Sequence, residues 1–359
     1  MIVFPENITI DVHDLATVLL RERQLTEPLF KNARLVEVID GPNQPNIFPL
    51  EDYCPTWGEL PEHRRTAFNV LHESEDFVEL TDFKHPQCIC PRDISEKELE
   101  TIYWCAKLYN SGYLLANVLR NIISDLPLTT KLRIRTSQGY EMICGKTDCV
   151  FNETAVLPDK IRFIGDFIPS PSNTQFKVGV HIICQKFYAL PWAFAVFGTR
   201  TDNATNECVV LDLVTPLLGG RGLGGEVFSM ERMEDYHGKI LDKCCKSSKS
   251  SEIDPYIFLG VSPEETIQLK RRVIERLERI ISGNESFCAY CGKSNAHSVC
   301  TACKGPKYCG KICQKKAWKY HKVWCKVDAN ARKEVRIFRL DPDNLTLIFV
   351  HRCPLTEFV

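Results

Sequence analysis

The chain has 359 residues, of which 44% are hydrophobic and 25% charged, and its formal net charge is −1. This is an ordinary globular balance, which excludes a wholly disordered chain, a collagen-like repeat and a coiled-coil rod. The longest uncharged apolar stretch, residues 187–199, is shorter than the roughly 20 residues of a membrane-spanning helix. The first residues lack the pattern of a secretory signal. We therefore expect no membrane segment and an intracellular location, cytoplasmic or nuclear.

The first half of the chain predicts little regular structure and then one long helix. Prolines at 42, 45, 49, 55 and 61 predict irregular, extended chain in the first 90 residues. Ser95 and Glu98 form a capping-box pattern, so a helix is expected to begin at Ser95 and to run toward Leu126, before Pro127. Its residues are apolar on more than one face, which indicates a central core helix. Gly112 is expected to mark a bend or a close contact.

Residues 131–214 change to a β pattern, rich in β-branched and aromatic residues and separated by Gly, Pro and Asn. The short turn at 137–139 predicts an antiparallel hairpin. Residues 1–261 are therefore expected to form an α+β body of unknown family. The predicted strands are 132–135, 140–144, 161–164, 176–184, 192–197 and 208–214.

A connecting helix is predicted over residues 262–283. Ser262 is its N-cap, Pro263 its first residue, Glu265 completes a capping box, and Gly283 follows its end. One half of its circumference is apolar, so it should pack on the body and join it rigidly to the next segment. Near the C-terminus, residues 335–340 and 345–350 predict a hairpin within a tail spanning 329–359.

Cysteine is the unusual component, because seven of the 18 cysteines fall within residues 288–325. Four close pairs of soft ligands suit two tetrahedral, closed zinc sites, and zinc binding would supply the folding energy of so small a module. Buried free thiols are disfavoured, because the segment has few aliphatic residues to surround them. The spacing alone leaves the pairing open between a sequential and an interleaved arrangement. The candidate ligands are Cys288, Cys291, Cys300, Cys303, Cys309, Cys313, His321 and Cys325.

The run YCGKICQKKAWKYHKVWC resembles the second half of a MYND-type zinc finger, and the resemblance covers residues 288–325. It implies an interleaved arrangement, with one zinc on residues 288, 291, 309 and 313 and the other on residues 300, 303, 321 and 325. It also implies that Gln314 and Trp318 form a shallow groove for proline-containing peptides, with Lys307 and Tyr308 as a strand edge. A flat indole suits an extended proline segment. The alternative is that Trp318 belongs to a small core of the finger.

Charge favours a protein partner for this segment. Residues 284–328 contain nine lysines, no arginine and two acids, a side-chain charge of +7 that two zinc ions and seven thiolates reduce to about +4. A partner with acidic flanks is favoured over lysines that serve only solubility. Nucleic acid is less favoured, because specific readers present Arg, Asn or Gln to the bases. We expect a eukaryotic-type adaptor or regulator, with nucleic-acid-associated regulation of transcription as a third possibility.

An enzyme carried by the body is the main alternative function. The glycine run 220–225 satisfies G-x-G-x-x-G, but residues 215–218 separate it from the preceding strand and no series of βα units surrounds it, which favours a turning loop. MYND fingers also occur beside SET-type methyltransferases and prolyl hydroxylases. The chain lacks the Asn-His-Ser-Cys motif and a convincing Gly-Glu-Glu-Leu stretch of the first, and the His-x-Asp of the second. We therefore expect no catalytic residue.

A third metal site is a minor alternative to scattered buried thiols. His85, Cys88 and Cys90 lie close together in the sequence. They are candidate ligands of a third metal, and the pair Cys144 and Cys149 or the pair Cys244 and Cys245 are candidates to join them.

Overall fold

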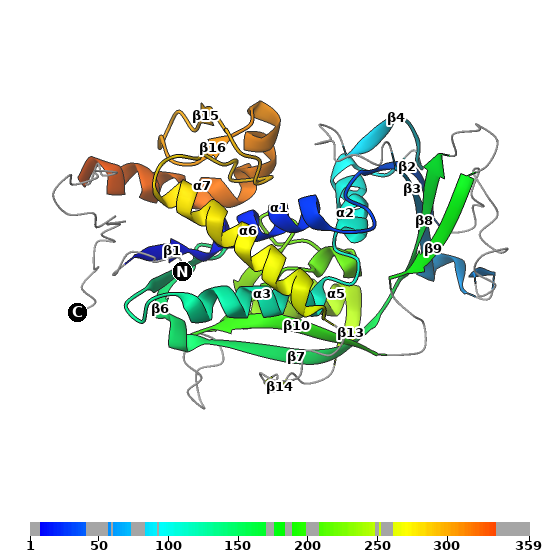
Figure 1. Cartoon of the computed structure of the whole chain (residues 1–359), viewed down its shortest axis with the longest axis horizontal. Coiled ribbons are helices and arrows are strands. Elements are labelled where there is room, and N and C mark those ends of the chain that lie inside the picture. The colour runs from blue at the N-terminus through cyan, green and yellow to red at the C-terminus, as the bar shows by residue number, and fades with distance from the viewer. Residues whose placement is uncertain are drawn as a thin grey trace.

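The computed structural model describes residues 8–40, 57–58, 60–72, 83–91, 93–169, 176–183, 189–198, 208–247, 251–252 and 261–334 (Figure 1). The hairpin predicted at 335–350 and the prolines at 42–55 lie outside these residues. Among the described residues, no helix combines the length and the hydrophobicity needed to cross a bilayer.

Two large sheets form the frame of the body, one at its end and one along its base (Figure 1). The five-stranded sheet is mixed: its central pair, β3 and β8, is parallel, and its edge pair, β8 and β9, is antiparallel. Its order is β4 (Lys84–Ile89), β2 (Ala33–Asp40), β3 (Arg65–His72), β8 (Ile161–Pro169) and β9 (Phe176–Ile182).

The second large sheet is antiparallel, and its strands β10 and β11 are almost wholly buried. Its order is β12 (Ser229–Arg232), β11 (Val209–Asp212), β10 (Leu190–Phe197), β7 (Cys149–Pro158) and β13 (Cys245–Ser247), with β14 (Ser251–Glu252) also paired to β7. A smaller sheet has the order β1 (Thr9–Asp11), β5 (Lys131–Arg135) and β6 (Glu141–Gly145).

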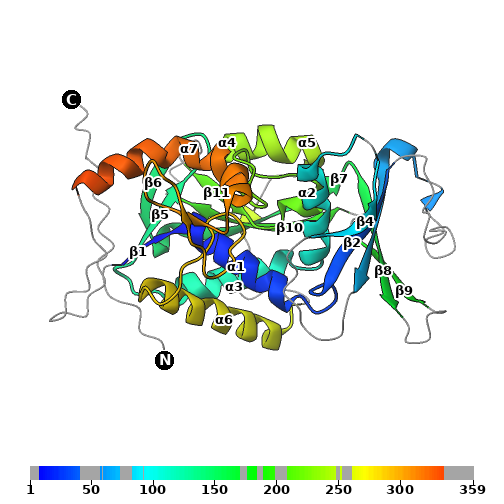
Figure 2. The ribbon, with the colours of Figure 1, turned by 90° about the horizontal axis from the view of Figure 1, so that it is seen from above.

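Four helices pack over these sheets and enclose the main core. In the view from above, α1 lies between α6 and α7 (Lys311–Glu334) (Figure 2), and α6 contacts both α1 and α3. The four are α1 (Val12–Thr26), α2 (Glu96–Lys107), α3 (Gly112–Asp125) and α6 (Pro263–Ile281). Short helical turns are η3 (Glu62–Arg64), η4 (Lys146–Asp148), η6 (Thr215–Leu218), α4 (Met233–Tyr236), η7 (His237–Leu241) and α5 (Asp242–Cys244).

A small module stands above α1 and α6 (Figure 1). It contains a two-stranded sheet, β15 (Ser298–Val299) paired with β16 (Lys307–Tyr308), followed by α7 (Lys311–Glu334). Its own core consists of the cysteines together with Ala296, Tyr308 and Ala317. The predicted α+β body with a small cysteine-rich module is confirmed.

The predicted helix at 262–283 is present, and its ends match their sequence signals. The Ser262 side chain accepts a hydrogen bond from the Glu265 amide, and Gly283 has φ of +77° just beyond the end. The Glu265 carboxylate does not complete the capping box, because it pairs instead with Arg23 of α1. The cap thus becomes a link between two helices.

The single helix predicted from Ser95 to Leu126 is wrong, because the chain breaks it into α2 and α3. The capping box of Ser95 and Glu98 is present at its start. Asn110 then takes a left-handed conformation, with φ of 51°, and the buried Ser111 side chain accepts a hydrogen bond from Arg23 at 2.8 Å. A side chain far away in the sequence therefore holds the turn, and Gly112 begins the second helix.

Candidate metal centre

The first four cysteines of the module lie on two tight loops with the same backbone pattern. The amide of Gly292 donates to the carbonyl of Cys288, and the amide of Lys304 donates to the carbonyl of Cys300. Gly292 and Lys304 both have positive φ, at 71° and 56°. Each loop closes directly after its second cysteine, so both sulfur atoms of a pair point to the same side.

The other four ligands come from β16 and α7. Cys309 follows β16 directly, and Cys313 lies in the first turn of α7. His321 and Cys325 are four positions apart, so they lie on one face of the helix and serve the same site. One helix therefore supplies ligands to both sites and fixes the distance between them.

The eight side chains form two groups, each with its ligand atoms within 4.8 Å of one another. The Sγ atoms of Cys291 and Cys309 are 3.5 Å apart, and those of Cys300 and Cys325 are 3.8 Å apart. A tetrahedral zinc with Zn–S bonds of about 2.3 Å separates its sulfurs by about 3.8 Å, so the groups fit zinc. The groups are Cys288, Cys291, Cys309, Cys313 and Cys300, Cys303, His321, Cys325.

This grouping decides between the two arrangements that the spacing leaves open. The interleaved pairing is confirmed, and the sequential one is excluded, because Cys309 and Cys313 lie with the first pair and not with His321. The family model described as "MYND finger" matches residues 288–325. Residues 288–325 are a MYND finger. The predicted cofactor, two zinc ions, fits its two sites, and such fingers are protein-interaction modules.

The matches to characterised proteins described here lie over the region of the MYND finger. The chain is 42% identical over 57 residues to histone-lysine N-methyltransferase ASHR1 of Arabidopsis thaliana, which is 16% of this chain and 12% of that protein. It is 48% identical over 44 residues to the MYND-type zinc finger protein samB of Aspergillus clavatus and of Aspergillus niger, 11% of this chain and 7% of those proteins. The matches thus span about a tenth of each relative. No solved structure matches the chain significantly.

The inner face of α7 fastens the MYND finger to the predicted hairpin of β5 and β6. The Tyr320 hydroxyl donates to the carbonyl of Arg135 at 3.2 Å, and the Trp324 indole nitrogen donates to the carbonyl of Thr136 at 3.1 Å. The Arg135 guanidinium lies over the Trp324 ring. These bonds satisfy carbonyls at the end of β5, where the strand ladder stops.

The first zinc loop rests directly on α1, where only glycine fits. A Cβ at Gly292 would lie 2.6 Å from the Cβ of Arg21 and 2.9 Å from the carbonyl oxygen of Thr17. Arg276 of α6 completes this contact, because its buried guanidinium donates to the carbonyl of Gly292 and to the Ser294 hydroxyl. The loop needs glycine both for its left-handed φ and for its approach to the helix.

A second polar cluster joins the MYND finger to α2 and to the glycine-rich loop. Glu100 accepts from the Tyr290 hydroxyl at 2.6 Å and pairs with Lys316 at 3.1 Å. Arg221, from the glycine run, lies 3.2 Å from Glu100 and donates to Tyr290 at 3.0 Å. The glycine run thus presents its arginine to the MYND finger.

The glycines of this run surround a carboxylate of the chain itself. A Cβ at Gly224 would lie 2.3 and 2.7 Å from the two carboxylate oxygens of Glu226, and one at Gly222 would lie 2.4 Å from the carbonyl oxygen of Phe228. The amide of Gly222 donates to the Glu226 carbonyl. The loop is therefore a tight turn folded around Glu226, which accounts for its glycine content.

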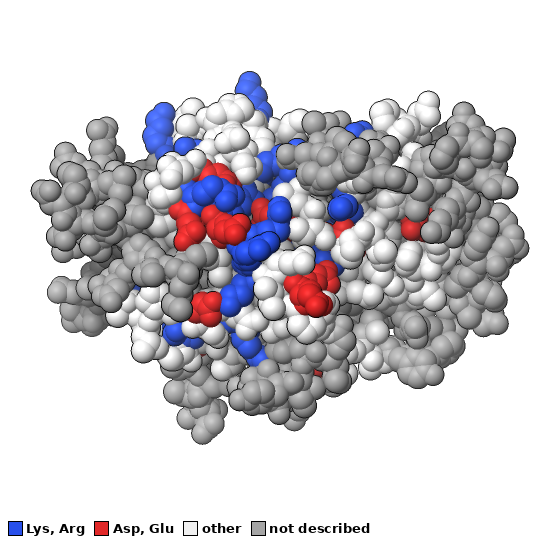
Figure 3. Space-filling view, in the orientation of Figure 1, with Lys and Arg blue, Asp and Glu red and all other residues white. Residues whose placement is uncertain are grey.

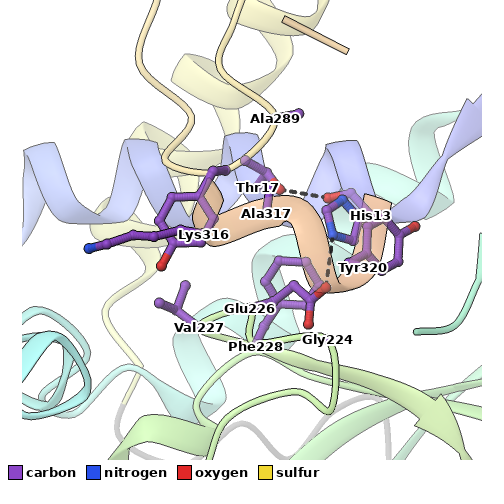
Figure 4. A pocket seen from close by; sticks show the side chains of 11 residues that line it. His13, Thr17, Gly224, Glu226, Val227, Phe228, Ala289, Lys316, Ala317 and Tyr320 are labelled. Atoms are coloured by element: carbon purple, nitrogen blue, oxygen red, sulfur yellow. Dashed lines mark hydrogen bonds and ion pairs between the residues drawn. The ribbon is translucent and has the colours of Figure 1, made fainter. Parts of the chain in front are cut away.

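Between this loop and α7 lies a cavity of about 10 Å³, the size of one water molecule (Figure 4). His13 stacks on the Tyr320 ring at a centroid distance of 4.0 Å, and its Nε2 lies 3.9 Å from Glu226 Oε1. A larger opening of about 610 Å³ lies between the MYND finger, β1 and the end of α6. Gln314 and Trp318 line neither space.

The two residues predicted to bind a peptide lie on the outer part of α7. Trp318 is 46% exposed, and Gln314, one helical turn before it, is half-buried. The ring of Trp318 packs edge-on against the zinc ligand His321, at a centroid distance of 5.8 Å. The zinc ligands are grouped as the resemblance implies, and peptide binding at Gln314 and Trp318 stays a prediction. The docking side chains Arg276, Tyr320 and Trp324 were not predicted from the sequence.

In the described part of the chain, three or more side chains able to bind metal bring their ligand atoms within 4.8 Å of one another at two places. Both are the groups of the MYND finger. His85, Cys88 and Cys90 do not form such a group, either with one another or with the further cysteines weighed above. Cys88 and Cys90 pack at the margin of the main core. Burial raises the pKa of the Cys88 thiol to about 11, so it stays protonated near neutrality.

Proposed function

We propose that this protein is an interaction adaptor whose MYND finger captures a proline-containing segment of a partner protein at Gln314 and Trp318. The observation that carries the proposal is the exposure of Trp318 on a helix whose other large aromatic side chains are buried. Tyr320 is 9% exposed and Trp324 is 4% exposed. An indole left 46% open beside a half-buried amide offers the flat apolar surface and the hydrogen-bonding group that a proline-rich segment uses.

The charges around this face favour a partner with acidic residues beside its prolines. The exposed lysines of the MYND finger are Lys304, Lys307, Lys311, Lys315, Lys319 and Lys322, and the exposed Lys326 follows directly after it. In Figure 3, basic side chains project at the upper edge of the molecule, where the MYND finger lies, while basic and acidic side chains are interleaved below it. Such a surface raises the rate of encounter with an acidic partner, and the effect falls with salt.

The body holds the face of α7 that carries Gln314 and Trp318 in a fixed position. The docking contacts at the β5–β6 hairpin and at Glu100 hold α7 through Tyr320, Trp324 and Lys316, and the contact at α1 holds the first zinc loop. The MYND finger therefore presents Gln314 and Trp318 in one fixed orientation to the body. A partner that binds there is also held at a fixed position next to whatever the body binds.

A peptide-binding experiment on the full-length, zinc-loaded protein tests the proposal. The probe is a labelled library of proline-containing peptides with acidic or neutral flanks. Trp318→Ala is expected to weaken the best peptides at least tenfold with two zinc ions retained. Ile312→Ala is the matched control, because Ile312 is an apolar residue of the same helix that is 74% exposed. Equal binding by wild type and Trp318→Ala would overturn the proposal.

A further inference from the structure

The opening of about 610 Å³ between the MYND finger, β1 and the end of α6 is large enough to hold a small molecule. Pockets that bind small molecules have volumes of roughly 300–1,000 Å³. Both parts of the chain line this cavity, because the inner face of α7 and the linker between α6 and the MYND finger border it together with α1 and β1. Gln314 and Trp318 do not line it, so it is separate from the proposed peptide surface.

Apolar side chains form one wall of this cavity. Leu277, Ile280 and Ile281 come from the last turns of α6, Phe287 comes from the linker, and Trp324 comes from α7. Leu277, Ile281 and Trp324 are each less than a tenth exposed, so this wall is already packed before a ligand enters. A ligand with an apolar body gains affinity by displacing water from such a wall.

Two acids and two arginines of the body also line the cavity, and their charges do not balance. Arg135 donates to Asp11 at 2.8 Å, and Arg133 donates at 2.8 Å to Glu141, which lies beside the cavity. Each arginine is thus close to a carboxylate of the chain. Asp14 is the second acid of the lining, so three carboxylates share two guanidinium groups and one negative charge is left over.

That charge lies on Asp14, in the first turn of α1. Within the described residues its carboxylate makes one ion-pair contact, a 4.0 Å approach to Nδ1 of His13. The His13 ring stacks on Tyr320 of α7, so this corner of the cavity lies where the body meets the MYND finger. Half of the Asp14 side chain is open, and it can therefore pair with a ligand without giving up a close partner.

Two further features of the lining favour a cation in the cavity. His321 belongs to the second zinc site, in which three thiolates and one Zn²⁺ leave a formal charge of −1. The last turn of α6 lines the cavity too, and the carboxyl end of a helix carries a partial negative charge. Of the other charged residues of the lining, Lys307 is exposed to water and Glu285 is paired with Arg276 and Arg279.

We propose that this cavity binds a small amphipathic amine, whose ammonium group pairs with Asp14 and whose apolar body lies against the wall formed by α6, Phe287 and Trp324. A carboxylate of the same shape is excluded, because Asp14 repels it and the two arginines already pair with acids of the chain. The bound amine contacts the body and the MYND finger at once. It therefore stabilises the docked position of the MYND finger, since that is the state to which it binds.

Three probes of one shape and different charge test the proposal on full-length, zinc-loaded protein at neutral pH: diphenylpropylamine, diphenylpropanol and diphenylpropionate. Titration calorimetry is expected to show the amine binding about tenfold more tightly than the alcohol, and the carboxylate binding weakest. Asp14→Asn should remove the advantage of the amine and leave the alcohol unchanged. Asp125→Asn is the matched control, an acid of α3 that is 51% exposed and does not line the cavity. Equal affinity for amine and alcohol, or no binding of the amine, would overturn the proposal.

A second set of measurements locates the bound amine. Ile280→Ala should weaken the amine and the alcohol alike, because it removes part of the apolar wall, whereas Ile267→Ala, at a position of the same helix that is 64% exposed and outside the lining, should weaken neither. Chelation of zinc should abolish binding, because α7 then leaves the cavity. Trp318→Ala should bind the amine as wild type does. Amine binding that survives chelation and Ile280→Ala unchanged would lie elsewhere on the protein and would refute the site.

Discussion

The indole nitrogen of Trp324 lies 3.1 Å from the carbonyl oxygen of Thr136, and this bond ties the last turn of the MYND finger to the end of β5. Trp324 directly precedes the final zinc ligand, Cys325. Six residues earlier on the same helix, Trp318 is open to solvent. The two tryptophans of α7 therefore differ: Trp324 is buried in the docking contact, whereas Trp318 is open to solvent, where we propose that it binds a partner.

Trp324→Ala should destabilise the whole protein, because it removes a buried ring and leaves the Thr136 carbonyl without its donor. We expect a loss of about 3–5 kcal/mol in the free energy of unfolding. Trp318→Ala should cost less than about 1 kcal/mol, since its ring is already half in water. Chemical denaturation of the two variants side by side measures this difference. Equal losses would show that both tryptophans serve the core.

Removal of zinc should unfold the MYND finger and uncover the surface of the body beneath it. Structural zinc supplies about 10–16 kcal/mol of apparent folding energy, which is far more than the small core of the finger can replace. After chelation, amide exchange should rise in α7 and at the β5–β6 turn, while β10 and β11 stay protected. Hydrogen exchange measures this pattern, and restored zinc should reverse it. Uniform exchange across the body would show instead that the body needs the finger to fold.

Arg276→Met should be strongly destabilising, because Arg276 joins α6, α1 and the first zinc loop. Its guanidinium is 2% exposed and pairs with Glu22 at 3.1 Å and Glu285 at 2.7 Å. Removing it takes the buried partner from Glu22 and Glu285 and leaves them with the more exposed Arg272 and Arg279, at a cost of about 3 kcal/mol. Arg276→Lys should recover little, since an ammonium cannot span both partners. Thermal and chemical unfolding of the two variants decide this, and full rescue by lysine would contradict the geometry.

A double-mutant cycle tests the packing of the glycine run around Glu226. Gly224→Ala should cost about 1–2 kcal/mol, because its Cβ meets only the Glu226 carboxylate within 3 Å. In a Glu226→Ala background that cost should vanish. Gly222→Ala should remain destabilising in both backgrounds, because its Cβ meets the carbonyl of Phe228. Denaturation midpoints of the variants give the coupling energy, and additive losses at Gly224 would refute the contact.

The raised pKa of Glu231 predicts how the free energy of unfolding depends on pH. Burial raises the pKa of its carboxyl to about 7 from an ordinary value of 4.5. As pH rises from about 4.5 to 7 the unfolded chain loses this proton first, so the group lowers the free energy of unfolding across that window, by up to about 3 kcal/mol. Its Oε1 accepts bonds from Ser137 and from the Leu223 amide, which glutamine can also accept.

Glu231→Gln should therefore be less sensitive to pH than wild type and more stable above pH 7. Unfolding free energies of both proteins at pH 4.5, 6 and 8 measure the difference, and other titrating groups cancel in the comparison. Parallel curves for the two proteins would show that Glu231 is ionised in the folded state.

The features that can be predicted from the sequence are those set by residues that lie close to one another in the chain. The zinc ligands were identifiable because chelation fixes their spacing, and the capping signals at Ser95 and Ser262 act within one turn. The α1 helix was missed because its polar residues are buried as well as its apolar ones. Arg23 and Glu22 are 2% and 5% exposed, and they pair with residues of α6 more than 200 positions away. Such a helix shows no polar face.

The same reason explains why the docking of the MYND finger and the strand β7 could not be predicted. The acceptors for Tyr320 and Trp324 are backbone carbonyls, which carry no signature of residue type. Strand β7 carries Asn152, Glu153 and Thr154 in its centre, and Asn152 and Thr154 are buried there. Alternation of polar and apolar residues identifies a strand only when polar side chains face water.

The attachment of α7 along its inner face also affects how strongly its outer face can bind. A segment that becomes ordered only on binding spends part of its interaction energy on its own loss of conformational entropy. Zinc and the body already order the helix that carries Gln314 and Trp318. In the binding mode proposed above, the remaining loss of conformational entropy therefore falls on the incoming peptide. Proline content should then set affinity as much as direct contacts do, because a peptide that is already extended in solution has less freedom to lose.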